Sequence, residues 1–349
     1  PYWNFYEKLS KVKLPNNKIE KSEYIYDKID KAVKYSLVSD VELSIAASGG
    51  LDSSILYHHI KKNNRNLSKL ISFKFKDKNY SEEFFVKEVT KKFGYKVDFS
   101  NINHKYFFKN LEKSVEINEE PFAGLPIISY QKCFEDLKKF KVVLDGSGLD
   151  EAHAGYAKYH LNIKNTNNKT QDGSLIGEII SNKFKQISTN YNNQLKCDLR
   201  NRMKKLMYLD LFYIKIPRAL RFRDKLSMAN SIELRPPFLD DDLICALFKL
   251  NSTDHFNKGF GKWLLREKYE KILGKQIVYR RKQQIQTPQR EWLRCFSYEI
   301  EKLIKNGKVW ETGWIDKKKF LNLYKKFLYG DFNNSFFIWK IINLNLWLK

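Results

Sequence analysis

Hydroxyl, glycine and carboxylate side chains are concentrated at residues 48–54, which read Ser-Gly-Gly-Leu-Asp-Ser-Ser. Glycines leave backbone N–H groups open to an anion, and hydroxyls add donors beside the positive end of a following helix. The segment is not a Walker loop, because it lacks the GxxxxGK[ST] spacing. It instead predicts a pyrophosphate site formed by Ser48, Gly49, Gly50, Asp52, Ser53 and Ser54.

A divalent cation is needed beside this segment, because the Asp52 carboxylate repels phosphate unless a metal lies between them. A second acidic glycine turn, Asp-Gly-Ser-Gly-Leu-Asp-Glu, occupies residues 145–151. We therefore predict that Asp52 and Asp150 are Mg²⁺ ligands. The alternative is an ordinary acidic helix start, in which Asp150 and Glu151 complement the helix dipole.

Both turns follow short apolar segments that read as strands and precede segments that read as helices. Strands are predicted at 41–47, 70–75, 95–99 and 141–144, and helices at 25–37, 55–62, 81–93, 105–116 and 126–140. This alternation predicts an α/β fold with a Rossmann-like parallel sheet covered by helices on both faces. Ligands bind beyond the carboxyl ends of such strands, so the two turns are expected to meet there.

The chain is expected to have four parts. Residues 1–24 resemble a linker, 25–160 form the nucleotide-binding core, 161–205 are an Asn-rich flap or insertion, and 206–349 are mainly helical. The helical part is broken by several prolines and is expected to belong to the same domain as the core.

Composition excludes several classes of protein. With 42% hydrophobic and 15% aromatic residues the chain is expected to fold, and no apolar run approaches the ~20 residues of a membrane span. Four widely spaced cysteines indicate neither a zinc site nor a disulfide framework, so a cytoplasmic protein is expected. The formal charge of +24 is spread along the chain, and a nucleic-acid partner is therefore not favoured.

Four ordered stretches carry a family resemblance. SGGLDSS resembles the PP-loop of the ATP pyrophosphatases, and it is followed by three longer stretches: VVLDGSGLDEAHAGYAKYH at 142–160, RALRFRDKLSMANSIELRPPFLD at 218–240 and YRRKQQIQTPQREWLR at 279–294. In order and spacing they resemble the synthetase domain of glutamine-dependent asparagine synthetases. The resemblance covers essentially the whole chain and implies an adenine nucleotide α-hydrolase type of fold.

The resemblance implies a ligase that uses ATP and Mg²⁺. A carboxylate such as aspartate or a sugar uronic acid attacks the α-phosphorus, pyrophosphate leaves, and ammonia opens the acyl-adenylate to give an amide and AMP. It also implies roles for single residues: the backbone of Phe75 meets adenine, Gly146 lies near AMP, Lys282 neutralises developing charge, and Asp224 lies in the acyl-acceptor pocket.

The sequence departs from the family at Ser147, where asparagine synthetases carry a glutamate that helps to bind or deprotonate the attacking nitrogen. A serine hydroxyl is no base near neutral pH, so either Asp224 or Glu233 does that work or the acceptor is not aspartate. The chain also begins at Pro1 without the family's glutaminase domain, so ammonia is expected from such a domain upstream, a separate glutaminase or solution.

Two alternatives use the same ATP chemistry. In the nearer one the nucleophile is an amine, as in β-lactam and macrolactam or lasso-peptide synthetases. In the remoter one the chain is a PP-loop enzyme that modifies tRNA, which would suit the positive charge.

Overall fold

A five-stranded parallel sheet lies at the centre of the fold. The computed structural model describes residues 3–65, 67–77, 79–122, 124–160, 178–182, 184, 185, 197–281 and 287–349. The strands are β1 (Leu43–Ala46), β2 (Lys69–Phe75), β3 (Val97–Ile102), β4 (Val142–Leu144) and β5 (Glu233–Arg235). Their order is β3-β2-β1-β4-β5, and the expected Rossmann-like α/β fold is confirmed.

The middle of the sheet is apolar because helices cover both of its faces. In β1 Ile45 is fully buried and pairs with Leu70 of β2 and Leu144 of β4. The helices within the first 160 residues are α1 (Phe5–Lys11), α2 (Lys18–Ser36), α3 (Leu51–Lys62), α4 (Glu83–Lys92), α5 (His104–Lys109), α6 (Leu111–Asn118), α7 (Pro126–Leu137) and α8 (Leu149–Ala152).

Several predicted element bounds were wrong. The helix expected at 25–37 begins at Lys18, within the segment expected to resemble a linker. The helix expected over 105–116 is divided into α5 and α6 at Asn110, which ends one helix and begins the other. The strand expected at 95–99 begins at Val97 and continues to Ile102, because all six of its residues pair with β2. Strand pairing, which is a tertiary property, decided both ends of β3.

The second half of the chain is mainly helical, as expected, but it also supplies a strand to the sheet. Its helices are α10 (Arg202–Leu209), α11 (Ile216–Met228), α12 (Asp241–Lys249), α13 (Ser252–His255), α14 (Trp263–Leu273), α15 (Lys275–Val278), α16 (Gln289–Cys295), α17 (Ser297–Lys305), α18 (Lys317–Leu328) and α19 (Ser335–Trp347). Strand β5 was not predicted, because three residues before two prolines carry no periodicity. A hairpin of β6 (Phe256–Asn257) and β7 (Phe260–Gly261) precedes α14.

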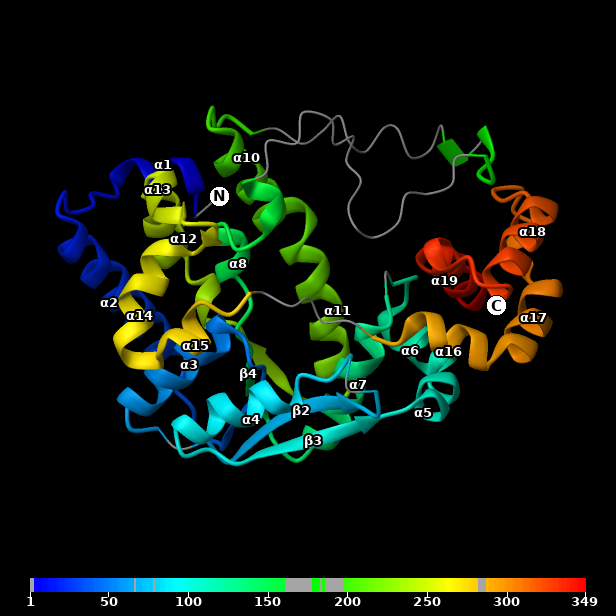
Figure 1. Cartoon of the computed structure of the whole chain (residues 1–349), viewed down its shortest axis with the longest axis horizontal. Coiled ribbons are helices and arrows are strands. Elements are labelled where there is room, and N and C mark those ends of the chain that lie inside the picture. The colour runs from blue at the N-terminus through cyan, green and yellow to red at the C-terminus, as the bar shows by residue number, and fades with distance from the viewer. Residues whose placement is uncertain are drawn as a thin grey trace.

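Two large apolar cores flank the sheet. One lies among α1–α3, α12 and α14, and the other among α5–α7 and α16–α19. In Figure 1 these helix groups occupy opposite ends of the molecule, and α11 runs between them. Within the residues that the structure describes, no helix is both long and apolar enough to cross a membrane.

Candidate functional site

The first loop, residues 47–50, joins β1 to α3 and is held by its own neighbours in sequence. The hydroxyls of Ser48 and Ser53 are 2.7 Å apart, and the Tyr57 hydroxyl lies 3.1 Å from both the backbone nitrogen and the backbone oxygen of Ser48. Gly50 caps α3 in an extended conformation without a side-chain cap. Because Gly50 has no side chain, the first N–H groups of α3 have no side-chain acceptor at the cap. This arrangement suits the binding of an anion.

The two glycines of this loop serve different purposes. A Cβ at Gly49 would lie 2.8 Å from Cβ of Phe85, so Gly49 lets α4 pack against the loop. A Cβ at Gly50 would make one ordinary contact, 3.5 Å from Oγ of Ser48. Ser54 is fully buried and its hydroxyl donates to the Gly50 carbonyl, so this hydroxyl is used within the helix.

The second loop, residues 145–148, joins β4 to α8 and lies against the first. A Cβ at Gly146 would be 3.4 Å from Oγ of Ser53, an ordinary contact distance. The two turns therefore meet at the carboxyl edge of the sheet, as predicted from their positions after β1 and β4. Gly148, with a φ of 120°, begins α8 where a Cβ would lie 2.7 Å from Leu239.

Arg223 of α11 fixes the second loop through side-chain contacts. Its guanidinium donates to Asp145 at 2.7 Å and to the Ser147 hydroxyl, and also to the Tyr130 hydroxyl at 2.9 Å. The Ser147 hydroxyl in turn donates to Asp145 at 2.6 Å. The side chains of Arg223 and Asp145 are only 16% and 8% exposed, so this is a nearly buried ion pair.

Asp52 and Asp150 lie close together, and Lys262 joins them. The Lys262 ammonium is 2.5 Å from Oδ1 of Asp52 and 2.7 Å from Oδ1 of Asp150. Burial lowers the pKa of Lys262, but the carboxylates of Asp150 and Asp52 outweigh it and the pKa is raised. The two predicted metal ligands therefore share one cationic partner, although they are 98 positions apart in the sequence (150 − 52).

These two carboxylates fit a divalent cation that also takes ligands from phosphate. Their oxygens already reach a common cation, the ammonium of Lys262. Within the described ranges, no group of three or more His, Cys, Asp or Glu side chains could hold a metal by itself. Mg²⁺ is commonly held by one or two carboxylates together with substrate phosphates and water, which matches this donor set.

The remaining predicted residues are spread over several elements. Phe75 ends β2, is buried and packs edge-on to Trp292 at 5.7 Å between ring centroids. Asp224 is exposed on α11, next to Arg223. Glu233 is exposed at the start of β5, pairs with Arg235 and lies beside Val142 rather than beside the second loop. Lys282 lies outside the described residues, as does most of the flap predicted at 161–205.

Sequence reasoning missed Arg223, Lys262 and Gly155. Arg223 lies within the 218–240 stretch, where the resemblance points to the neighbouring Asp224 instead. Lys262 follows a Gly-Phe-Gly turn and is far in sequence from Asp52 and Asp150. Gly155 is only five positions after Asp150 (155 − 150), but its close packing against that carboxylate leaves no signal in the sequence. A buried lysine cannot be told from a surface lysine in a chain with 64 lysines and arginines.

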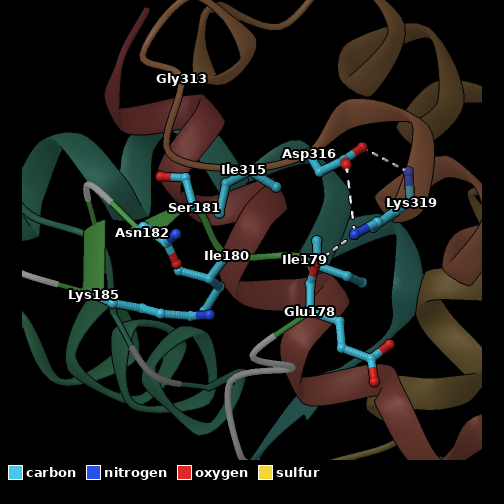
Figure 2. A pocket seen from close by; sticks show the side chains of 10 residues that line it. All are labelled: Glu178, Ile179, Ile180, Ser181, Asn182, Lys185, Gly313, Ile315, Asp316 and Lys319. Carbon is cyan, nitrogen blue, oxygen red and sulfur yellow. Dashed lines mark hydrogen bonds and ion pairs between the residues drawn. The ribbon is translucent and has the colours of Figure 1, made fainter.

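A separate cavity of about 480 Å³ lies far from both loops. Figure 2 shows it between residues 178–182 with Lys185 and the segment that leads into α18, where Ile180 pairs with Ile315. In Figure 1 α18 lies at the right-hand end of the molecule, whereas α8 lies left of its centre. None of the predicted site residues in the described ranges lines this cavity, and we assign it no part in the chemistry.

Comparison with known proteins agrees with this geometry. The sequence is 25% identical to asparagine synthetase [glutamine-hydrolyzing] 1 of Bacillus subtilis, over 93% of this chain and 58% of that protein. It is 26% identical to asparagine synthetase [glutamine-hydrolyzing] 3 of the same organism, over 72% of this chain and 46% of that protein. A putative asparagine synthetase [glutamine-hydrolyzing] 2 of Methanocaldococcus jannaschii is 36% identical over 41% of this chain and 27% of that protein.

The chain thus spans about half the length of the two Bacillus relatives. The sequence model of the family described as asparagine synthase matches residues 25–349, which include both loops and the helical half. The chain belongs to the asparagine synthase family.

Proposed function

We propose that this protein forms amides from carboxylic acids and ATP, through an acyl-adenylate and with release of AMP and pyrophosphate. The observation that carries the proposal is the convergence of Asp52 and Asp150, from the first turns of α3 and α8, on one buried cation. Paired carboxylates beside a glycine loop at a helix N-terminus suit a metal–pyrophosphate complex. Membership of the asparagine synthase family supports the same reaction.

In this proposal the first loop receives the departing diphosphate. The N–H groups at the start of α3 and the hydroxyls of Ser48 and Ser53 are donors already fixed by the fold. Donors held in place before the reaction stabilise developing negative charge without reorganising. Ser54 is proposed to contribute by fixing the start of α3, since both its backbone N–H and its hydroxyl donate to the Gly50 carbonyl.

Asp52 and Asp150 hold Mg²⁺ in this proposal. A bound Mg²⁺ would supply Lewis acidity and neutralise phosphate charge. Lys282 adds a second positive charge near the reacting phosphate, as the family resemblance implies. Its segment follows Arg280, whose guanidinium stacks 4.0 Å over the ring of Phe85, next to the first loop. This anchoring beside Gly49 supports the role proposed for Lys282.

The second loop faces the acid and the nitrogen nucleophile. Ser147 is engaged by both Asp145 and Arg223 and positions the loop rather than removing a proton. Gly146 lies against Ser53 and is proposed to lie near AMP, and the backbone of Phe75 is proposed to meet adenine. Asp224 remains the candidate for the acceptor pocket. Aspartate and sugar uronic acids are the carboxylates that we propose first.

Exchange of labelled pyrophosphate into ATP tests the proposal directly. With Mg²⁺ and without a nitrogen donor, the correct acid should stimulate exchange, because adenylation is reversible. Aspartate, glucuronate and galacturonate are compared with a no-acid control. Adding ammonium should then give AMP and an amide. Formation of ADP in place of AMP would contradict the proposal.

The mass of the product separates ammonia from an amine as nucleophile. Amidation by ammonia lowers the mass of the acid by about one unit, whereas cyclisation by an internal amine removes a water. The nitrogen donor is proposed to be ammonia, from solution or from a glutaminase. Adding glutamine alone, then ammonium alone, to the same reaction identifies the source.

A further inference from the structure

Lys262 is held in an unusual backbone conformation at the start of α14. Its φ of 56° and ψ of 37° are left-handed, although lysine has a side chain that disfavours this region. Its backbone N–H donates to the His153 carbonyl at 3.1 Å, which ties the hairpin before α14 to the end of α8. The residue is only 4% exposed. The fold therefore directs this ammonium inward at some expense in backbone strain.

Space for the Lys262 side chain is built into the neighbouring backbone. A Cβ at Gly155 would lie 2.0 Å from Oδ1 of Asp150 and 2.5 Å from Cε of Lys262. A Cβ at Gly261 would lie 2.1 Å from the Ala154 carbonyl oxygen. A side chain at Gly155 would displace the lysine or the carboxylate, and one at Gly261 would displace the backbone at Ala154. The placement of Lys262 therefore depends on two glycines on different segments.

The charges explain why a cation is needed at this point. Asp52 and Asp150 bring two carboxylates to one ammonium in a site that is largely shielded from water. Two buried carboxylates at close range repel each other unless a cation or a proton lies between them. The nearby Arg266 guanidinium donates to the Gly261 and Val278 carbonyls, so its hydrogen bonds hold backbone rather than these carboxylates.

We infer that Lys262 is a resident cation of the Asp52–Asp150 pair in the metal-free protein, and that Mg²⁺ displaces its ammonium from at least one of the two carboxylates. Free Mg²⁺ then competes with a tethered charge and binds weakly by itself. Phosphate oxygens add ligands to Mg²⁺ and so favour the metal over the ammonium at the carboxylates. The metal therefore enters with the nucleotide. This inference rests on the metal ligands of the proposed function, but it concerns binding and not catalysis.

Thermal unfolding with Mg²⁺ as the only added ligand tests the exchange. The wild type, Lys262→Met and Lys271→Met are compared in EDTA and in millimolar Mg²⁺, with NaCl matching the ionic strength. Lys271 is an exposed lysine on the same helix and serves as the control. We expect Lys262→Met to have the lowest Tm in EDTA and to gain several degrees more from Mg²⁺ than the other two proteins.

Equal Mg²⁺ shifts in Lys262→Met and the wild type would overturn the inference, as would an unchanged Tm of the variant in EDTA. If Lys262→Met does not fold in EDTA, refolding is repeated with Mg²⁺ and with Lys262→Gln, which keeps a hydrogen-bond donor. Refolding of either variant in Mg²⁺ supports the replacement of the Lys262 ammonium by the metal. Failure of both variants to refold in Mg²⁺ overturns the inference. The unfolding experiment contains no ATP. If labelled pyrophosphate failed to enter ATP, the proposed reaction would be refuted, but the measured effect of Mg²⁺ on Lys262→Met would still stand.

Discussion

The two loops at the carboxyl edge of the sheet perform similar tasks but are held in different ways. The first loop is fixed by Ser53 and Tyr57, within ten residues of Ser48, and leads into a 12-residue helix. The second leads into a helix of only four residues and is fixed by Arg223 of α11. Lys262, immediately before α14, binds Asp150 of that short helix as well as Asp52 of α3. A four-residue helix has little stability of its own, so distant elements must hold it.

This difference indicates that the first loop is a local structure and the second a tertiary one. Loss of a contact with a distant element should therefore unfold or displace the second loop. Substitutions in the first loop should instead alter its local packing or its binding of an anion.

Arg223→Met should lower the free energy of unfolding by about 3–5 kcal/mol, because it leaves the nearly buried Asp145 carboxylate without its partner. Arg221→Met is the matched control on the same helix. Arg221 is 59% exposed and pairs with Glu120, so its loss should be below about 1 kcal/mol. Urea unfolding followed by circular dichroism measures both. Similar losses in the two variants would show that the second loop does not depend on α11.

Asp52→Asn and Asp150→Asn should each reduce AMP formation by about 100-fold or more, because each removes a proposed metal ligand. The double variant should lose little more than either single variant, since both loops serve one site. The release of AMP measured by chromatography gives the rates, and Asp98→Asn, at an exposed carboxylate of β3, is the control. A near-normal rate of AMP formation in either single variant would show that the two carboxylates do not serve one metal site.

Acidification should destabilise the protein through buried His59 of α3. Its ring bonds to Asp30 and Tyr269, and burial, partly opposed by Asp30, lowers its pKa to about 4. The unfolded chain binds a proton below its usual pKa near 6.5, while folded His59 stays neutral until about 4, so stability falls as the pH falls through this window. The loss by pH 5 is about 2 kcal/mol for this group.

Urea unfolding of the wild type and His59→Gln at pH 7 and at pH 5 measures this effect. The variant should lose less stability on acidification, although it is less stable at pH 7. The remaining pH dependence is expected to include His153 and His255, whose pKa values burial also lowers and which support the second loop. If His59→Gln lost as much stability between pH 7 and pH 5 as the wild type, His59 would not contribute to the acid sensitivity.

Gly49→Ala and Gly50→Ala should act on different properties of the first loop. Gly49→Ala forces a methyl group against Phe85 and should lower stability by about 1–3 kcal/mol. Gly50→Ala has room for its methyl group and a φ of −77°, so it should lower stability by about 1 kcal/mol or less and weaken nucleotide binding. Urea unfolding and ATP titration measure the two properties, and the reverse pattern would contradict this division.

The prediction from sequence succeeded where the signal is local. The apolar strand before Ser48 and the glycine and hydroxyl pattern after it predicted β1, the first loop and α3, and β4 followed from the same kind of signal. It failed for β5, because Glu233–Arg235 is a strand only through its pairing with β4. The break between α5 and α6 at Asn110 was also missed, since the hydrophobic pattern continues across it.

The sequence alone determined that two carboxylate-bearing turns lie at one edge of a parallel sheet, because strand direction and the βαβ alternation leave few other arrangements. Only the tertiary structure decided which cations these carboxylates meet. Arg223 and Lys262 reach the second loop from segments 73 or more positions further along the chain, counted from Asp150 (223 − 150). Such contacts follow from how helices pack on the sheet, and a basic residue carries no sign in its own sequence neighbourhood that it will be buried against an acid.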